Sequence, residues 1–120
     1  MNPKPAFSIS ARARGFVFAG RGLLVMLKSQ HNAWIHAVAS ILVVAAGLWL
    51  EVSRLEWCAL VLAIAAVWTA ESLNTALELL CDVASPAFHP LVKQAKDVAA
   101  AAVLLSAVGS LAVGALVFWP

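Results

Sequence analysis

The chain has 120 residues, of which 63% are hydrophobic and 12% are charged. A soluble domain is closer to half apolar and a quarter charged, so this balance indicates an integral membrane protein and excludes a large soluble domain. Eight basic against six acidic side chains leave a formal charge of +2, which is too small to indicate a nucleic-acid-binding protein.

The first predicted element is an amphipathic surface helix over about residues 10–30. This segment is neither long nor apolar enough to cross a bilayer, but Arg14, Arg21 and Lys28 recur every seven residues and fall on one side of a helix. It has no apolar core followed directly by a small-residue cleavage site, so we interpret it as retained rather than as a signal peptide. A basic anchor without a catalytic role explains these basic residues equally well.

Three transmembrane helices are predicted next, over about residues 33–50, 57–82 and 94–119. A span needs roughly 20 apolar residues. The first has His36 as its only titratable group, whereas the second qualifies only if it carries its carboxylates near one membrane face. No alternating strand pattern competes. We therefore expect an all-α integral membrane protein, a helix bundle forming a single membrane domain over residues 1–120.

Basic residues set the predicted orientation. Arg12, Arg14, Arg21 and Lys28 precede the first span, and Lys93 and Lys96 lie between the second and third spans. The turn "EVSRLEW" (51–57) has Arg54 set against Glu51 and Glu56. By the positive-inside rule, the N-terminus and the second loop are cytoplasmic and the C-terminus is outside. Three tryptophans then fall at the outer interface, where indoles prefer to lie: Trp49, Trp57 and Trp119.

The second span ends in "WTAESLNTALELLCD", where four polar residues at helical spacing share one face: Glu71, Asn74, Glu78 and Asp82. Ionisable groups in a membrane are expensive and usually functional. Counted from Trp57, Glu71 is about 21 Å along the helix, inside a hydrocarbon core of about 30 Å. Its carboxylate suits a general base or acid. Glu78, near the wet boundary, suits a hard cation such as Mg²⁺.

The next stretch, "SPAFHP" (85–90), contains two prolines that break the helix and predict a short cytoplasmic turn. Lys96 and Asp97 then open the third span at the same membrane face. A lysine beside carboxylates at an ATP-accessible surface suggests phosphate binding. Alternatively, Lys96 pairs with Asp97 or Glu78 and only stabilises the helix ends. Small residues recur every four positions along the third span and favour close helix packing: Ala102, Ser106, Ser110 and Gly114.

The motifs "ESLNTALE" and "FHPLVKQAKDVAAAAVLL" resemble those of the prokaryotic diacylglycerol kinase family, which includes the undecaprenol kinases, and "HNAWIH" is similar to the N-x-x-I-H of the latter. The resemblance covers the chain from about Arg14 to its end. It implies a homotrimer in the bacterial cytoplasmic (inner) membrane, with sites shared between protomers. It also implies transfer of the γ-phosphate of MgATP to the hydroxyl of undecaprenol or diacylglycerol at the cytoplasmic interface.

The resemblance implies a role for each matching position. Glu71 is the catalytic base at the lipid hydroxyl, Asn74 supports the nucleotide and the base, and Glu78 ligates Mg²⁺. Lys96 and Asp97 contact the phosphates. Two turn residues match positions near the nucleotide, and these are Phe88 and His89.

Two positions depart from the family pattern. The second metal-binding glutamate of the family is replaced here by Gln30, which offers a carbonyl oxygen but no charge. Either metal affinity falls, or His31 or a phosphate oxygen completes the metal shell. The nucleotide-binding N-terminal arginine of the family aligns poorly, and Arg12 or Arg14 takes its place.

Two hypotheses from other classes compete with the kinase. One is a small oligomeric ion or proton pathway, with Glu71 and Asp82 as a relay. It leaves the clustering of Lys96, Asp97 and Glu78 unexplained, and the stretch 57–67 offers no polar groups to continue a relay. The other is an accessory membrane protein whose polar stripe only holds helices together.

Overall fold

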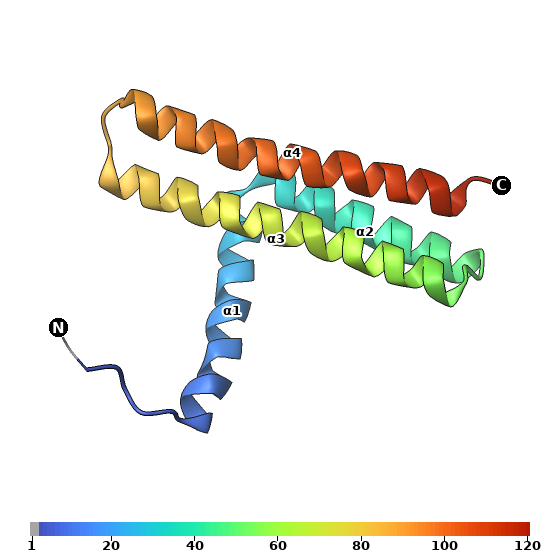
Figure 1. Ribbon diagram of the computed structural model, residues 1–120, viewed down its shortest axis with the longest axis horizontal. Coiled ribbons are helices and arrows are strands. Elements are labelled where there is room, and N and C mark those ends of the chain that lie inside the picture. Colours follow the sequence, from blue (N-terminus) through green and yellow to red (C-terminus); the bar gives the residue numbers. More distant parts are fainter. Residues whose placement is uncertain (1–2) are drawn as a thin grey trace.

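A computed structural model describes residues 3–120, and that part of the chain contains four helices and no strand (Figure 1). The helices are α1 (Ile9–Ser29), α2 (His31–Trp49), α3 (Arg54–Ala84) and α4 (Pro90–Phe118). The last three are long and apolar enough to cross a membrane. The prediction of an all-α chain with three apolar helices is therefore confirmed.

Helices α1 and α2 meet at one extended residue. Gln30, with φ of −122° and ψ of 118°, ends α1 and begins α2. The Trp34 indole donates from Nε1 to the Leu27 carbonyl at 2.7 Å, and the buried Met26 has its Sδ 3.5 Å from the Ser72 hydroxyl on α3. These contacts hold the end of α1 against the bundle, while the rest of α1 leaves it sideways (Figure 1).

Helix α3 begins earlier than the expected residue 57, inside the segment predicted to be a turn. Ser53 Oγ accepts from the Glu56 amide at 3.1 Å, and Glu56 Oε1 accepts from the Ser53 amide at 3.0 Å. This capping box satisfies two amides that a helix start otherwise leaves unpaired, so the helix starts at Arg54. The turn before it places Glu51 in the left-handed region, at φ 51°, where glycine and asparagine are favoured.

Helix α4 also begins earlier than the expected residue 94. Only the first of the two prolines, Pro86, lies in the turn, because Pro90 is the first residue of α4. A proline at this position loses no intrahelical hydrogen bond and already has a helical φ. His89 caps the helix, with its Nδ1 accepting from the Leu91 amide at 3.1 Å. The second proline therefore starts a helix rather than breaking one.

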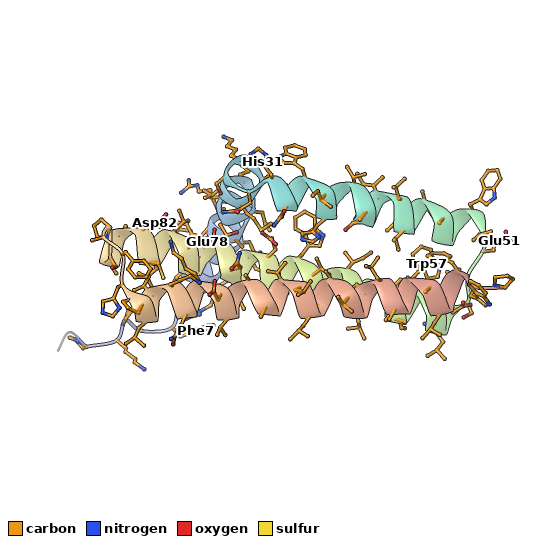
Figure 2. The ribbon with its side chains drawn as sticks, turned by 90° about the horizontal axis from the view of Figure 1, so that it is seen from above. Phe7, His31, Glu51, Trp57, Glu78 and Asp82 are labelled. Carbon is orange, nitrogen blue, oxygen red and sulfur yellow. The ribbon has the colours of Figure 1, made fainter. Side chains whose placement is uncertain are left out.

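Helix α3 packs against both of the other apolar helices, α2 and α4 (Figures 1 and 2). The Trp68 indole donates to Ser40 Oγ at 3.0 Å, and that hydroxyl donates to the His36 carbonyl at 2.7 Å. Near the other end of the pair, the Trp57 ring lies so close to Gly47 that an added Cβ would stand 2.7 Å from it. The hydrogen bond between Trp68 and Ser40, and the close approach of Trp57 to Gly47, thus set how α2 and α3 pack.

Helix α4 also packs against α3. Ser110 Oγ donates to the Ala63 carbonyl at 3.0 Å, so the small-residue stripe meets α3 of the same chain. No side chain of α4 is buried, and large apolar ones are exposed, including Leu105, Leu111 and Leu116. The outer face of α4 is therefore left for lipid or for another protein helix.

The three apolar helices differ in length. At 1.5 Å per residue, α2 is about 28 Å long, whereas α3 is about 46 Å and α4 about 44 Å. A hydrocarbon core of about 30 Å matches α2 and leaves both others roughly 15 Å too long. Since the α2–α3 turn joins these helices at one end, the excess lies at the α3–α4 hairpin, which extends past the level where α1 leaves (Figure 1).

Candidate functional site

The antiparallel packing of α2 on α3 brings Gln30 opposite Glu78. Gln30 Nε2 donates to Glu78 Oε2 at 3.1 Å, and Asn74 Nδ2 donates to Glu78 Oε1 at 3.5 Å. The amide oxygen of Asn74 is buried and has no hydrogen-bond donor among the described residues. The glutamine that departs from the family pattern is therefore in direct contact with the predicted metal ligand.

Deeper along the same helix pair, His36 lies opposite Glu71. The Glu71 side chain is only 1% exposed, and its Oε2 is 3.4 Å from His36 Nε2. This distance is within ion-pair range, but the two groups are not aligned as a hydrogen bond, and neither carboxylate oxygen has a hydrogen-bond partner in the described chain. The predicted base is thus buried beside a single basic side chain.

Glu71 and Glu78 lie at different distances along the α3 axis. Counted from Arg54, Glu71 is about 26 Å along the axis, close to the 28 Å length of α2, while Glu78 is at about 36 Å. Glu71 therefore lies within the length of α2, and Glu78 lies past its end, where Gln30 begins α2.

Farther out, the α3–α4 hairpin carries a second polar group of residues. A hollow of about 590 Å³ is lined by residues of both helices and the turn, including Asp82, Phe88, His89, Lys93 and Lys96. Asp82 follows Glu78 by one helical turn, about 6 Å along the axis. The hollow therefore adjoins the Gln30–Glu78 pair.

The ion pairs in this hairpin differ from the alternative drawn from the sequence. Lys96 Nζ contacts Asp82 Oδ1 at 3.1 Å, so neither Asp97 nor Glu78 is its partner. Asp97 instead pairs with Lys93, one turn earlier on α4, at 2.7 Å. Successive residues on a helix point about 100° apart, so Lys96 faces α3 while Asp97 faces outward. Asp97 is not part of the hollow lining.

The residues around Glu78 suit Mg²⁺ only with help from a substrate. No group of three or more His, Cys, Asp or Glu side chains in residues 3–120 is arranged to hold a metal. Mg²⁺ in proteins is often held by one or two carboxylates together with substrate phosphates and waters, and all of its ligands are oxygens. Glu78 supplies a carboxylate, Gln30 can turn its amide oxygen toward it, and the unpaired Asn74 oxygen can accept from a bound water.

Residues 17–118 match the family model of the prokaryotic diacylglycerol kinases. This chain belongs to that family. It is 40% identical to undecaprenol kinase of Bacillus subtilis (strain 168) over 107 residues, which cover 89% of this chain and 87% of that protein. Diacylglycerol kinase of Synechocystis sp. is 35% identical over 106 residues, covering 88% and 61%. Diacylglycerol kinase of Escherichia coli (strain K12) is 29% identical over 99 residues, covering 77% and 81%.

Membership makes the protein an ATP-dependent lipid kinase of a bacterial membrane. It displaces the ion-pathway hypothesis, which rested on the membrane carboxylates alone. Within this lipid kinase, the structure brings together Gln30, Asn74 and Glu78, with Glu71 next to them. It also groups Lys96 with the hairpin residues Phe88 and His89.

Arg14 stands apart from these groups. It is exposed on α1, about 22 Å along the helix axis from Ser29, and α1 leads away from the bundle (Figure 1). Arg12 lies with its guanidinium 5.7 Å from the centre of the Phe7 ring, a cation–π contact on the same helix end. Within one chain, neither arginine reaches the residues expected to bind the nucleotide.

His36 is the residue near the site that the sequence analysis did not assign. Its signal was present, because it is the only titratable group in the first span, and an ionisable side chain at such a depth is a functional-site candidate. What the sequence lacked was its partner. The contact with Glu71 depends on how α2 and α3 are aligned, which no local pattern reveals.

Proposed function

We propose that this lipid kinase transfers the γ-phosphate of MgATP to the hydroxyl of a membrane lipid at the cytoplasmic interface. One observation carries the proposal: Glu71 is a fully buried carboxylate near the end of the shortest apolar helix, α2, and Glu78 and Lys96 follow it toward the α3–α4 hairpin, which extends past α2. A lipid hydroxyl and an aqueous phosphate donor can meet only at the boundary between membrane and water. Phosphoryl transfer needs positioning, charge neutralisation and a base, and these groups supply all three.

Glu71 is the general base in this proposal. Its carboxylate takes the hydroxyl proton as the lipid oxygen bonds to the γ-phosphorus and the bond to the β–γ bridging oxygen breaks, releasing ADP. Because the Glu71 side chain is 1% exposed, bulk water has little access to the same carboxylate. Exclusion of water favours transfer to the lipid over hydrolysis of ATP.

The nucleotide binds farther out along α3 and in the hairpin. Glu78 and Gln30 hold Mg²⁺, which when bound neutralises charge on the phosphates, and Asn74 supports the nucleotide next to them. Lys96 exchanges its partner Asp82 for phosphate oxygens. Two turn residues complete the hollow at the nucleotide: Phe88, which is exposed, and His89, whose Nε2 remains free because Nδ1 caps α4.

Asp97 and Arg14 belong to the nucleotide side indirectly. A carboxylate approaches phosphates only with a cation between them, so Asp97 acts through its ion-pair partner Lys93, which lines the hollow. Arg14 reaches a nucleotide only if α1 extends over a neighbouring protomer. We therefore propose a homotrimer of single-domain protomers with shared sites, and the exposed apolar face of α4 supports association.

The lipid is a membrane alcohol, with undecaprenol as the first candidate and diacylglycerol as the second. The relative that is 40% identical is named for undecaprenol, and those at 35% and 29% are named for diacylglycerol. An apolar groove of about 390 Å³ between α2, α3 and α4 leads from His36 to Phe118 and can hold a hydrocarbon chain. A chain in this groove carries its hydroxyl toward Glu71.

The orientation follows from the donor. ATP is cytoplasmic, so the hairpin and the N-terminus face the cytoplasm and the C-terminus lies outside the bacterial inner membrane. The basic residues Lys93 and Lys96 in the hairpin support the same orientation.

The test uses purified protein in bilayers with γ-labelled ATP, Mg²⁺ and either undecaprenol, diacylglycerol or an alkyl chain without a hydroxyl. We expect labelled product from at least one alcohol and none from the alkane. Absence of labelled lipid with every alcohol would refute the proposal. Glu71→Gln should abolish transfer while protection of the fold by MgATP persists, and a Glu71→Gln enzyme that still turns over would remove Glu71 as the base.

A further inference from the structure

The carboxylate of Glu71 is buried without the partners that a buried charge needs. Both oxygens lack a hydrogen bond among the described residues, and the side chain is 1% exposed. An ionised carboxylate in apolar surroundings is strongly destabilised unless it is paired. A general base must nevertheless be ionised and aimed at the hydroxyl before the phosphate arrives.

His36 offers the missing partner. Its Nε2 is also buried, lacks a hydrogen bond, and lies 3.4 Å from Glu71 Oε2. No other basic side chain of the described residues lies within ion-pair distance of Glu71. Two buried polar atoms of complementary type therefore lie 3.4 Å apart but are not aligned as a hydrogen bond. In ligand-free sites, catalytic hydrogen bonds are often long and tighten only when the substrate binds.

The surrounding helices hold His36 in this place. One turn deeper in the membrane, the Trp68 indole donates to Ser40 Oγ at 3.0 Å, and Ser40 donates to the backbone carbonyl of His36 at 2.7 Å. Trp68 precedes Glu71 by about one turn on α3, as His36 precedes Ser40 by one turn on α2. Because the helices are antiparallel, this interhelical bond aligns His36 with Glu71.

We propose that His36 is the positioning residue for Glu71, an inference that rests on the proposed role of Glu71 as the base. The neutral imidazole donates from Nε2–H to Glu71 Oε2, which stabilises the carboxylate and leaves Oε1 for the lipid hydroxyl. The hydroxyl proton passes to Oε1, and His36 neither gains nor loses a proton in the step. The imidazole thereby selects one carboxylate rotamer and keeps it ready for each lipid that enters.

The test compares two substitutions of similar length at one position. His36→Met fills the space without a donor, whereas His36→Gln carries an amide donor the same number of bonds from Cβ as Nε2. The free energy lost with a hydrogen bond to a charged group corresponds to roughly a 10- to 100-fold change in a rate or equilibrium constant. We expect His36→Met to lower kcat for lipid phosphorylation by this factor with KM for MgATP unchanged, and His36→Gln to restore most of it.

The control is Ile41→Met, which introduces the same side chain at an exposed position of α2 and should leave kcat unchanged. If His36→Met retains wild-type kcat, or if His36→Gln is as impaired as His36→Met, the positioning role is overturned.

A measurement independent of turnover separates this inference from the proposed function. Thermal unfolding of the His36→Met, Glu71→Gln and double variants forms a double-mutant cycle. We expect the two substitutions to be non-additive, because each removes one half of the same contact. Additive effects overturn the pairing even if the wild type is active. A wild type that labels no lipid refutes the kinase proposal, and the cycle still decides whether His36 holds Glu71.

Discussion

The replacement of Gln30 by glutamate tests the metal site, because the added charge should destabilise the protein without Mg²⁺ and strengthen its binding of Mg²⁺. In the structure, Gln30 Nε2 donates to Glu78 Oε2 at 3.1 Å. Gln30→Glu replaces that donor by a second carboxylate oxygen. At 3.1 Å, two like charges repel by about 1 kcal/mol in bulk water and about 5 kcal/mol at an effective dielectric constant of 20.

Without metal, the variant should therefore unfold at a lower temperature than the wild type. Glu78 is half-buried, so the loss lies between those limits after the two side chains rotate apart. With Mg²⁺, the same two carboxylates bracket one cation and the repulsion becomes attraction. We expect the Mg²⁺ concentration for half-maximal lipid phosphorylation to fall by about tenfold, which corresponds to about 1.4 kcal/mol.

The assay combines thermal unfolding in a chelator and across a Mg²⁺ titration with kinase rates over the same titration. Gln30→Met is the matched control, since it removes the hydrogen bond without adding charge and should show no gain in Mg²⁺ affinity. An unchanged Mg²⁺ requirement in Gln30→Glu, together with an unchanged melting temperature in chelator, would show that this position does not face the metal and that the reasoning is wrong.

Three further outcomes are expected. Gly47→Ala should destabilise the protein by about 1–3 kcal/mol in thermal unfolding, because the added Cβ would meet the Trp57 ring at 2.7 Å. The control Gly109→Ala has open space around the added Cβ and should not destabilise it. Equal melting temperatures of the two variants would contradict the packing of Trp57 on Gly47. Glu51→Gly should raise the melting temperature by relieving about 1 kcal/mol of left-handed strain, and a decrease would show that the turn is not strained. Lys96→Met should raise KM for ATP about tenfold or more through loss of a charged contact, and an unaltered KM would remove Lys96 from the phosphates.

Much of the fold was predictable because it depends on local properties. Helical period, apolar length and the expense of charge in a membrane are read along the chain itself, and they located the three apolar helices and the stripe from Glu71 to Glu78. The helix starts were predicted less well. Ser53 and Pro90 are start signals, but each lies in a segment that also resembles a turn, and only the hydrogen bonds of the caps decide the boundary.

Contacts between helices were not predictable in the same way. The sequence alone determined which residues share a face of α3, because that follows from 3.6 residues per turn. The tertiary structure decided what each of them meets: His36 for Glu71, Gln30 for Glu78 and Asp82 for Lys96. These pairings depend on the rotation and alignment of whole helices, which are set by packing at a few distant points, such as the Ser40–Trp68 hydrogen bond.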